Sequence, residues 1–282
     1  MSRPAPPVVD FYSRHPISEA QIVAALRRGG KDLERLAPED LYDFDQDHYG
    51  GLEAVEALGR RAGIDAASRV LDVCAGLAGP ARFMARRWGA RVTGIDLNPE
   101  RAAGARRLSA AVGLDGLVRM VRGDAQVLPF RAGAFTAVVS QEGLLHVPDK
   151  AEALAECRRV LLPGGRIAFS DWIATARLSD RERRRLDEWM AAVTLQSIEG
   201  YKALLAGAGF IAVGAEDLSI EWIAILRRRL EMFRGLRADS VARLGQARYD
   251  EYDQLYTFFV GLVEAGRLGG ARFSATAGRE TF

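Results

Sequence analysis

Residues 69–98 carry side chains whose types and spacing suit the binding of a nucleoside. Gly76 and Gly79 follow a short apolar run, where glycines let the backbone turn tightly and approach a ligand closely. Asp96 follows about 20 residues later, where a carboxylate can accept hydrogen bonds from a ribose diol. Asp72 lies inside the end of the apolar run itself. Together these residues predict a nucleoside-binding half-domain.

The glycine spacing separates two kinds of cofactor. A dinucleotide site needs G-x-G-x-x-G, because a pyrophosphate must lie against bare backbone, but Cys74 stands in the first glycine position. Asp72 would also repel a pyrophosphate, whereas it suits an ammonium group. S-adenosylmethionine carries an ammonium, a carboxylate, a ribose and a sulfonium cation. We therefore predict S-adenosylmethionine as the cofactor, and keep an NAD(P)-dependent oxidoreductase as an alternative.

The surrounding pattern predicts an α/β fold, a Rossmann-like, doubly wound and mainly parallel seven-stranded sheet. Five expected strands alternate with helices, and they lie at 70–73, 91–95, 118–121, 135–140 and 166–170. Such alternation gives parallel strands with right-handed crossovers, and ligands bind at their carboxyl ends. Two further strands are expected at 210–218 and 271–277.

Sequence outside this alternation predicts an added helical cap. Residues 1–50 are expected to form an N-terminal helical lid, beginning with a loose proline-rich arm over 1–9. In that lid Ser18-x-x-Gln21 is a capping box that starts a helix. Residues 51–282 are expected to form the cofactor-binding domain. Helical insertions are expected within it at about 173–197 and 220–265, the second containing helices over 220–235 and 238–265.

Bulk properties are those of an ordinary globular protein, with 49 % hydrophobic and 27 % charged residues. A net charge of +2 is far from the basic face of a nucleic-acid-binding protein. Cys74 and Cys157 suggest no disulfide framework, and no apolar stretch approaches the length of a membrane span. We predict a cytoplasmic protein with neither nucleic acid nor membrane as partner. Its oligomeric state is open, and a homodimer is compatible with the sequence.

Successive segments of the chain resemble the motifs of class I S-adenosylmethionine-dependent methyltransferases. These segments are 70–79, 94–97, 123–130, 135–146 and 161–171, within a resemblance that covers roughly residues 50–215. Residues 46–54 and 140–146 are similar to small-molecule amine methyltransferases of the phosphoethanolamine and glycine/sarcosine/dimethylglycine groups. The chain departs from the family pattern E/D-x-G-x-G-x-G at Cys74 and Ala78.

The resemblance implies which residues would hold the methionine part of the cofactor. Asp72 would bind the ammonium directly or through water. The backbone of Ala75 and Gly76 would lie beside the methionine, and Ser140 and Gln141 would line the same end.

For the nucleoside part, the resemblance implies a second set of residues. Asp96 would bind the ribose hydroxyls, and Leu97 would pack on the adenine. Asp124 would accept from the adenine amino group, with the Ala125 N–H facing a ring nitrogen. Asp171 could be a metal ligand, but no second and third ligand present themselves, so we predict no metal.

Catalysis would be an in-line displacement in which the cofactor supplies the activated group and the protein supplies binding and orientation. An amine or hydroxyl acceptor must also lose a proton, and His146, just past the fourth strand, is the candidate base. In the lid, His48 and Tyr49 are candidates for contact with the cofactor or for a proton relay, His48 foremost as a cofactor contact and Tyr49 as a catalytic residue. Tyr12 and His15 are expected to be structural or to belong to the same cap.

These residues predict a methyltransferase that acts on nitrogen or oxygen of a small molecule. The alternative is a C-methyltransferase for a prenyl or polyketide-type substrate, because a lid rich in acids and aromatics could steady a carbocation. The D/N-P-P-Y/F motif of nucleic-acid amino-methyltransferases is absent at 140–143. A cofactor-binding scaffold without catalysis is the last alternative, and nothing in the sequence names the acceptor.

Overall fold

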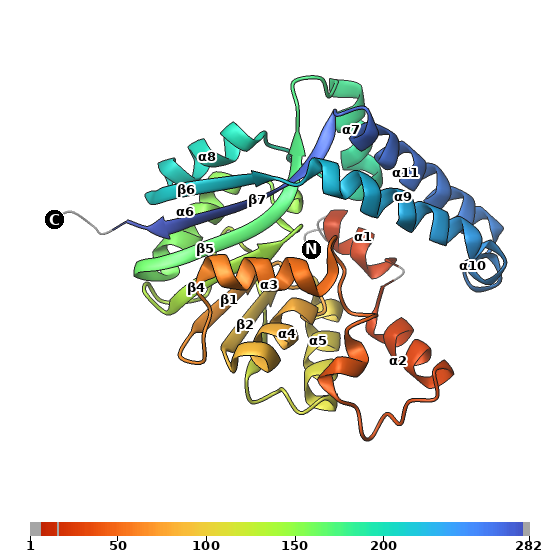
Figure 1. Cartoon of the computed structure of the whole chain (residues 1–282), viewed down its shortest axis with the longest axis horizontal. Coiled ribbons are helices and arrows are strands. Elements are labelled where there is room, and N and C mark those ends of the chain that lie inside the picture. Colours follow the sequence, from red (N-terminus) through yellow and green to blue (C-terminus); the bar gives the residue numbers. More distant parts are fainter. Residues whose placement is uncertain (1–6, 16, 279–282) are drawn as a thin grey trace, which may run out of the picture.

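One sheet runs through the protein, which we describe from a computed structural model covering residues 7–15 and 17–278 (Figure 1). The strand order in this part of the chain is β3-β2-β1-β4-β5-β7-β6. The strands are β1 Arg69–Val73, β2 Arg91–Asp96, β3 Val118–Arg122, β4 Phe135–Gln141, β5 Leu161–Ala174, β6 Phe210–Asp217 and β7 Leu268–Ala277. Strands β1 to β5 pair in parallel, and only β7 is antiparallel to its neighbours β5 and β6. The predicted seven-stranded, mainly parallel Rossmann-like sheet is confirmed.

Helices cover both faces of this sheet. One face is covered by three helices, which are α3 Gly51–Ala62, α4 Gly79–Trp88 and α5 Pro99–Ala111. They share a core with β1 and β2 in which Val70 and Val92 are almost fully buried. On the other face, α6 Lys150–Val160 and α8 Ile198–Gly207 pack against Leu71 and Val138. Because β1 is buried on both faces beyond its exposed first residue, Arg69, its sequence is almost continuously apolar. Asp72 is the polar exception among its buried residues.

Two further groups of helices lie outside this three-layer core. We call α1 Pro7–Ser13, α2 Glu19–Arg28, the short helix η1 Pro38–Leu41 and the segment up to Gly50 the lid. We call α7 Asp180–Met190, α9 Ser219–Gly235, α10 Arg237–Leu244 and α11 Gln246–Glu264 the cap. The cap is bound to β5 and β7 by a third apolar core that includes Trp172, Trp222 and Phe259. The division of the chain into a lid and one larger domain stays a prediction.

Three local expectations were wrong. The arm expected to be loose over 1–9 is helical from Pro7 onward, while residues 1–6 lie outside the described residues. The single helix expected over 238–265 is broken into α10 and α11 at Gly245, whose φ of 82° no regular helix allows. Strand β5 is much longer than 166–170, because its pairing with β7 extends as far as Ala174.

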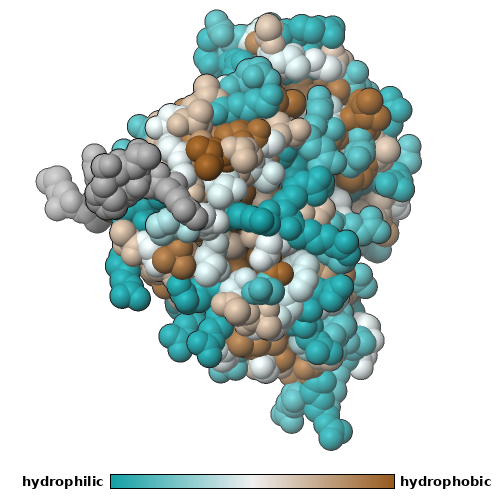
Figure 2. Space-filling view, turned by 60° about the vertical axis from the view of Figure 1, so that its left-hand side comes forward, coloured by the Kyte–Doolittle hydropathy of each residue, from teal (hydrophilic) through white to brown (hydrophobic). Residues whose placement is uncertain are grey.

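Six large apolar side chains are exposed among the described residues, and they come from several elements: Phe44, Val127, Ile211, Ile220, Met232 and Leu236. The most exposed of them are Val127 and Ile220, which lie on separate elements. Figure 2 shows apolar residues interspersed with polar ones on the face that it displays. Single exposed apolar side chains are normal, so homodimerisation stays a prediction. No helix within the described ranges is both long and apolar enough to cross a bilayer.

Candidate active site

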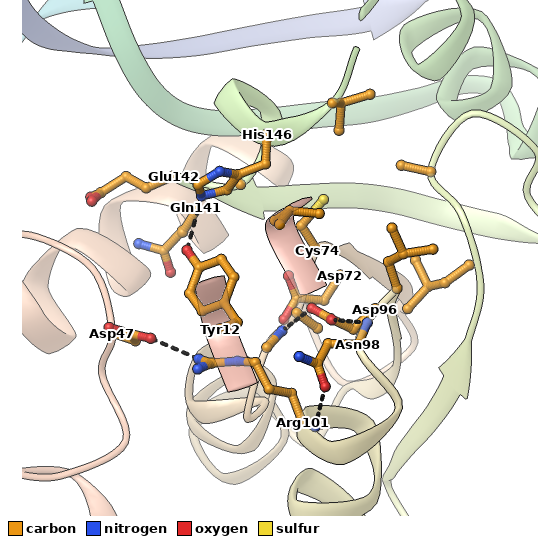
Figure 3. Close-up of a pocket in the computed structure, with 18 of the residues that line it drawn as sticks. Tyr12, Asp47, Asp72, Cys74, Asp96, Asn98, Arg101, Gln141, Glu142 and His146 are labelled. Carbon is orange, nitrogen blue, oxygen red and sulfur yellow. Dashed lines mark hydrogen bonds and ion pairs between the residues drawn. The ribbon is translucent and has the colours of Figure 1, made fainter. Parts of the chain in front are cut away.

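A cavity lies at the carboxyl ends of β1, β2 and β4, with α1 of the lid beside it (Figure 3). It brings together most of the residues that the sequence predicts for the site. Those that line it are His48, Asp72, Ala75, Gly76, Asp96, Leu97, Asp124, Ala125, Gln141 and His146. Four of the five segments that supply them lie at the ends of β1 to β4, at one edge of the sheet as the topology requires, and the fifth, at His48, belongs to the lid.

Two predicted residues are not among those that line the cavity. The hydroxyl of Ser140 donates to the Val73 carbonyl at 2.8 Å and so ties β4 to the end of β1. The ring of Tyr49 packs into the cap against Trp222, with 4.8 Å between ring centroids, while its backbone N–H donates to Glu142. Both side chains therefore stabilise the structure around the cavity and do not form its wall.

The turn after β1 keeps a left-handed backbone at three positions. Cys74, Gly76 and Ala78 have φ of 59°, 55° and 60°. The backbone path expected of a glycine-rich turn is thus present although two of the glycines are not, at a cost of about 1–2 kcal/mol for each non-glycine residue. Gly79 is needed by the chain itself, because a Cβ there would lie 2.1 Å from the carbonyl oxygen of Asp45 in the lid.

Asp96 holds this turn in place. One carboxylate oxygen accepts from the Gly76 N–H at 2.7 Å, and the other accepts from the Asn98 N–H at 2.9 Å. Burial nevertheless raises the pKa of Asp96. Since each carboxylate oxygen can accept more than one hydrogen bond, the side chain retains acceptor capacity toward the cavity.

Asp72 is the electrostatic anomaly of the cavity. Its side chain is 2 % exposed, and its Oδ2 has no hydrogen-bond partner among the described residues. Burial, together with the nearby Asp96 carboxylate, raises the pKa of Asp72 to about 8. A buried carboxyl without a partner is a costly feature, and a cation placed against it would remove that cost.

His146 lies at the end of the short helix η2 Leu144–His146, with both ring nitrogens engaged. Its Nδ1 is 2.8 Å from the Ala191 carbonyl oxygen, and its Nε2 is 2.9 Å from the Tyr12 hydroxyl. A carbonyl can only accept, so Nδ1 carries the proton and Nε2 presents a lone pair. Burial lowers the pKa of His146 to about 4, and the ring is therefore neutral at pH 7.

Tyr12, expected to be structural or to belong to the same cap as His48 and Tyr49, lies in the cavity wall. Its ring lies over the Arg101 guanidinium at 4.6 Å, and Arg101 donates to the Asp47 carboxylate at 2.7 Å. Asn98 binds the backbone of α1 through the Val9 carbonyl. These contacts fasten α1 and the segment around Asp47 to the start of α5, so the lid closes one side of the cavity (Figure 3).

Glu142 is a further buried carboxyl at this site, and the sequence analysis assigned it no role. Its Oε1 accepts from the Tyr49 N–H at 2.8 Å. Burial raises the pKa of Glu142 to about 8, although that hydrogen bond opposes the shift. The signal for it was its place between Gln141 and His146, directly after a strand that ends at the cavity.

Comparison with known proteins places this geometry in a family. The family described as "Methyltransferase domain" matches residues 71–169. Methyltransferase GfsG of Streptomyces halstedii is 31 % identical over 172 residues, which are 60 % of this chain and 62 % of that protein. The 27-O-demethylrifamycin SV methyltransferase of Amycolatopsis mediterranei is 30 % identical over 188 residues, 66 % of this chain and 69 % of that protein. The chain belongs to the class I S-adenosylmethionine-dependent methyltransferases.

The fold of this methyltransferase has close counterparts among solved structures. Phosphoethanolamine N-methyltransferase 2 of Haemonchus contortus, in complex with S-adenosyl-L-methionine, matches it with a TM-score of 0.79 at 21 % identity. The match covers 96 % of this chain and 60 % of that one. The chain thus spans less than two thirds of the length of the Haemonchus contortus enzyme and of GfsG. The family and the fold predicted from the sequence are both confirmed.

Metal ligands do not gather anywhere in the described ranges. Among residues 7–15 and 17–278, no group of three His, Cys, Asp or Glu side chains is arranged to hold a metal ion. Asp171 instead accepts a hydrogen bond from the Tyr201 hydroxyl, and burial raises the pKa of Asp171 to about 6.

Proposed function

We propose that this enzyme transfers a methyl group from S-adenosylmethionine to a nitrogen or oxygen atom of a small molecule, with His146 as the general base. The observation that carries the proposal is the fixed tautomer of His146. The Ala191 carbonyl holds the proton on Nδ1, and Nε2 presents its lone pair to the Tyr12 hydroxyl in the cavity wall. A neutral imidazole in this orientation is the form that accepts a proton from an acceptor N–H or O–H.

The residues at the strand ends fit S-adenosylmethionine. The orphaned, buried Asp72 oxygen suits its ammonium, and the remaining acceptor capacity of Asp96 suits the ribose diol. Leu97 is proposed to pack on the adenine, with Asp124 and the Ala125 N–H at its polar edge. When bound, the cofactor supplies the methyl group as part of a sulfonium cation. The chain's own residues would bind the cofactor, orient the acceptor toward its methyl group and exclude water from the cavity.

The acidic lining of the cavity favours a cationic acceptor, and hence an amine over a phenol. A bound cation would ionise Asp72 and Glu142, which are mostly protonated at pH 7 in the free enzyme. Acidic side chains outnumber the single arginine in this lining: the acids are Asp45, Asp47, Asp72, Asp96, Asp124 and Glu142, and the arginine is Arg101. Arg101 is already paired with Asp47. The pKa of Glu142 is about 8 in this wall, and a protonated amine beside the carboxyl would favour its ionised form.

Tyr12 gives the proton a route out of the acceptor. Its hydroxyl donates to Nε2 of His146 at 2.9 Å, and it therefore occupies the position from which an acceptor would deliver its proton. We propose that the acceptor nitrogen either takes this position or hands its proton to His146 through the Tyr12 hydroxyl. Burial raises the pKa of Tyr12, which keeps the hydroxyl protonated and able to donate.

The remaining expectations of the sequence are part of the same proposal. We propose a cytoplasmic enzyme whose lid is residues 1–50, and whose acceptor is neither nucleic acid nor a membrane component. Cys74 and Cys157 are both free, which is consistent with a reducing compartment. The mild net charge of +2 gives nucleic acid no extended basic face to bind.

A panel of acceptors tests the function. The full chain is incubated with methyl-labelled S-adenosylmethionine and, separately, small primary and secondary amines, phenols and a prenyl diphosphate. We expect label to be transferred to at least one amine. Transfer only to the prenyl diphosphate would replace the proposal by C-methylation, and transfer to none, with intact cofactor binding, would leave a scaffold.

A further inference from the structure

A chain of hydrogen bonds runs from a buried ion pair in the lid to the cavity wall. Asp45 and Arg82 form that pair, with 2.9 Å between Oδ2 and Nη2 and with both side chains almost fully buried. The Gln46 amide nitrogen donates to the other oxygen of Asp45 at 2.6 Å. His48 Nε2 is 2.9 Å from Gln46 Oε1, and Gln141 Nε2 is 3.3 Å from His48 Nδ1.

The direction of every hydrogen bond in this chain follows from its first member. Asp45 is an acceptor, because its carboxylate is paired with Arg82, so Gln46 must present its NH₂ group to Asp45. Gln46 therefore presents its carbonyl oxygen to His48, and His48 must carry its proton on Nε2. The lone pair of His48 is then on Nδ1, where it can accept only from the NH₂ group of Gln141.

His48 has a competing contact that would redirect the Gln141 amide if Nδ1 carried a proton. Nδ1 also lies 3.2 Å from the Tyr49 carbonyl oxygen, which could be satisfied by a second ring proton. Burial lowers the pKa of His48 to about 4, so the ring carries one proton at pH 7. The shorter contact, with Gln46, takes that proton.

The consequence reaches the cavity through the orientation of the Gln141 side chain. With its NH₂ group directed at His48, its carbonyl oxygen is the amide atom left for the cavity that Gln141 lines. That oxygen is buried and has no hydrogen-bond partner among the described residues, as is true of Oδ2 of Asp72. Val139 is the register partner of Asp72, so Asp72 and Gln141 project from the same face of adjacent strands.

We infer that Gln46 and His48 are positioning residues, which hold the Gln141 carbonyl oxygen toward the cavity so that it accepts from the ammonium group of the bound cofactor. This inference rests on the proposed function, since S-adenosylmethionine supplies the ammonium. Two orphaned acceptors on one face call for a group with several donors, and an ammonium has three N–H groups to offer. Gln46 in the lid thus determines which way the Gln141 side-chain amide on β4 is oriented, although Gln46 itself does not line the cavity.

Calorimetric titration with two ligands tests the inference. S-adenosylhomocysteine has the ammonium, whereas 5′-methylthioadenosine has the same nucleoside and thioether without it. Gln46 does not line the cavity, so Gln46→Met, which is nearly isosteric, removes the relay and leaves the wall intact. We expect the variant to bind S-adenosylhomocysteine about tenfold more weakly, the effect of one hydrogen bond to a charged group, and to bind 5′-methylthioadenosine as the parent does. Gln21→Met, the same change elsewhere in the lid, is the matched control and should alter neither affinity.

A double-mutant cycle separates positioning from a general effect on the fold. Because Gln46 acts only through Gln141, Gln46→Met should cost nothing further in a Gln141→Met background. Additive losses, or equal losses for both ligands, would overturn the inference. If Gln46→Met does not fold by circular dichroism, Gln46→Ser, which shortens the side chain without adding apolar surface, gives the same comparison. A parent enzyme that binds neither ligand would overturn the proposed function together with this inference.

Discussion

The two halves of the cavity are built in different ways. The cofactor half consists of strand ends and the turns that directly follow them, around Asp72, Asp96 and Asp124. The acceptor half is assembled from segments distant in sequence: Tyr12 and His146 are separated by 134 positions, and His146 and Ala191 by 45. The first half is therefore a property of the sheet, and the second a property of how the lid and cap pack onto it.

This difference predicts separate effects on binding and on turnover. Residues of the cofactor half should govern affinity for S-adenosylhomocysteine. Those of the acceptor half should govern the chemical step.

Replacing the proposed base should produce the largest effect. His146→Ala removes the Nε2 lone pair, and we expect turnover to fall by about 10²- to 10⁴-fold, the usual contribution of a general base. S-adenosylhomocysteine affinity should stay within about twofold, because the wall around Asp72 and Asp96 is untouched. Initial rates with a saturating acceptor and calorimetry measure the two quantities. Unchanged turnover would remove His146 from the mechanism.

Breaking the ion pair that anchors the lid should be the next largest effect. Arg82→Met leaves the Asp45 carboxylate buried without its partner, and we expect a loss of about 3–5 kcal/mol in the free energy of unfolding. Arg86→Met, one turn further along α4, removes an exposed pair with Glu39 and is the matched control. Urea denaturation compares them. Equal stability of the two variants would contradict an anchoring role for Arg82.

The raised pKa of Asp72 predicts a pH dependence of cofactor-analogue binding. In the free enzyme the carboxyl, with a pKa of about 8, is mostly protonated at pH 7, whereas a bound ammonium favours the ionised form. Binding of S-adenosylhomocysteine should therefore release protons and tighten as the pH rises from 6 to 8.

Calorimetry in buffers of different ionisation enthalpy measures this proton release. Asp72→Asn cannot ionise, so its share of the release should vanish. A release that is unchanged in Asp72→Asn would assign the proton to another group, such as Glu142.

The same carboxyl should influence stability without ligand. Its pKa in the folded chain is raised above the unfolded value, so the folded state binds the extra proton. The stability associated with that proton is present below the unfolded pKa of about 3.9 and is lost as the pH rises toward 8. Thermal melts of the parent and of Asp72→Asn between pH 5 and 9 should diverge in that direction.

The strained turn predicts the smallest effect. Ala78→Gly removes the strain of a non-glycine residue in the left-handed region but raises the conformational entropy of the unfolded chain. The free energy of unfolding should therefore rise by at most about 1 kcal/mol. Ala75→Gly, at a position without positive φ, should instead lower stability by about 0.4–1 kcal/mol. Thermal melts measure both, and a loss in Ala78→Gly as large as in Ala75→Gly would contradict the strain.

The sequence could predict the sheet and the cofactor half because both depend on local pattern. The alternation of strands and helices determines which strand ends meet, so Asp72, Asp96 and Asp124 could be placed together before any contact was known. The acceptor half could not be predicted in this way. Tyr12 reaches His146 only because Asn98 and Arg101 fasten α1 to the start of α5.

Tyr49 shows the same limit from the other side. Its position beside His48 favoured a place in the cavity, but the chain turns sharply at Gly50 and Gly51, which have φ of 86° and 53°. The ring then joins the apolar core of the cap and contacts Trp222. An aromatic ring after such a turn packs into whichever apolar core lies nearest. The spacing of residues in the sequence cannot predict which core that is.

Calorimetric titration of the full chain with S-adenosylhomocysteine and, in parallel, with NAD tests the central claim most directly. If the strand-end cavity is the site of a sulfonium nucleoside, the first ligand should bind with one-to-one stoichiometry, and NAD should give no saturable heat. The opposite result, or no binding of S-adenosylhomocysteine at millimolar concentration, would contradict the assignment of this cavity to the methyl donor.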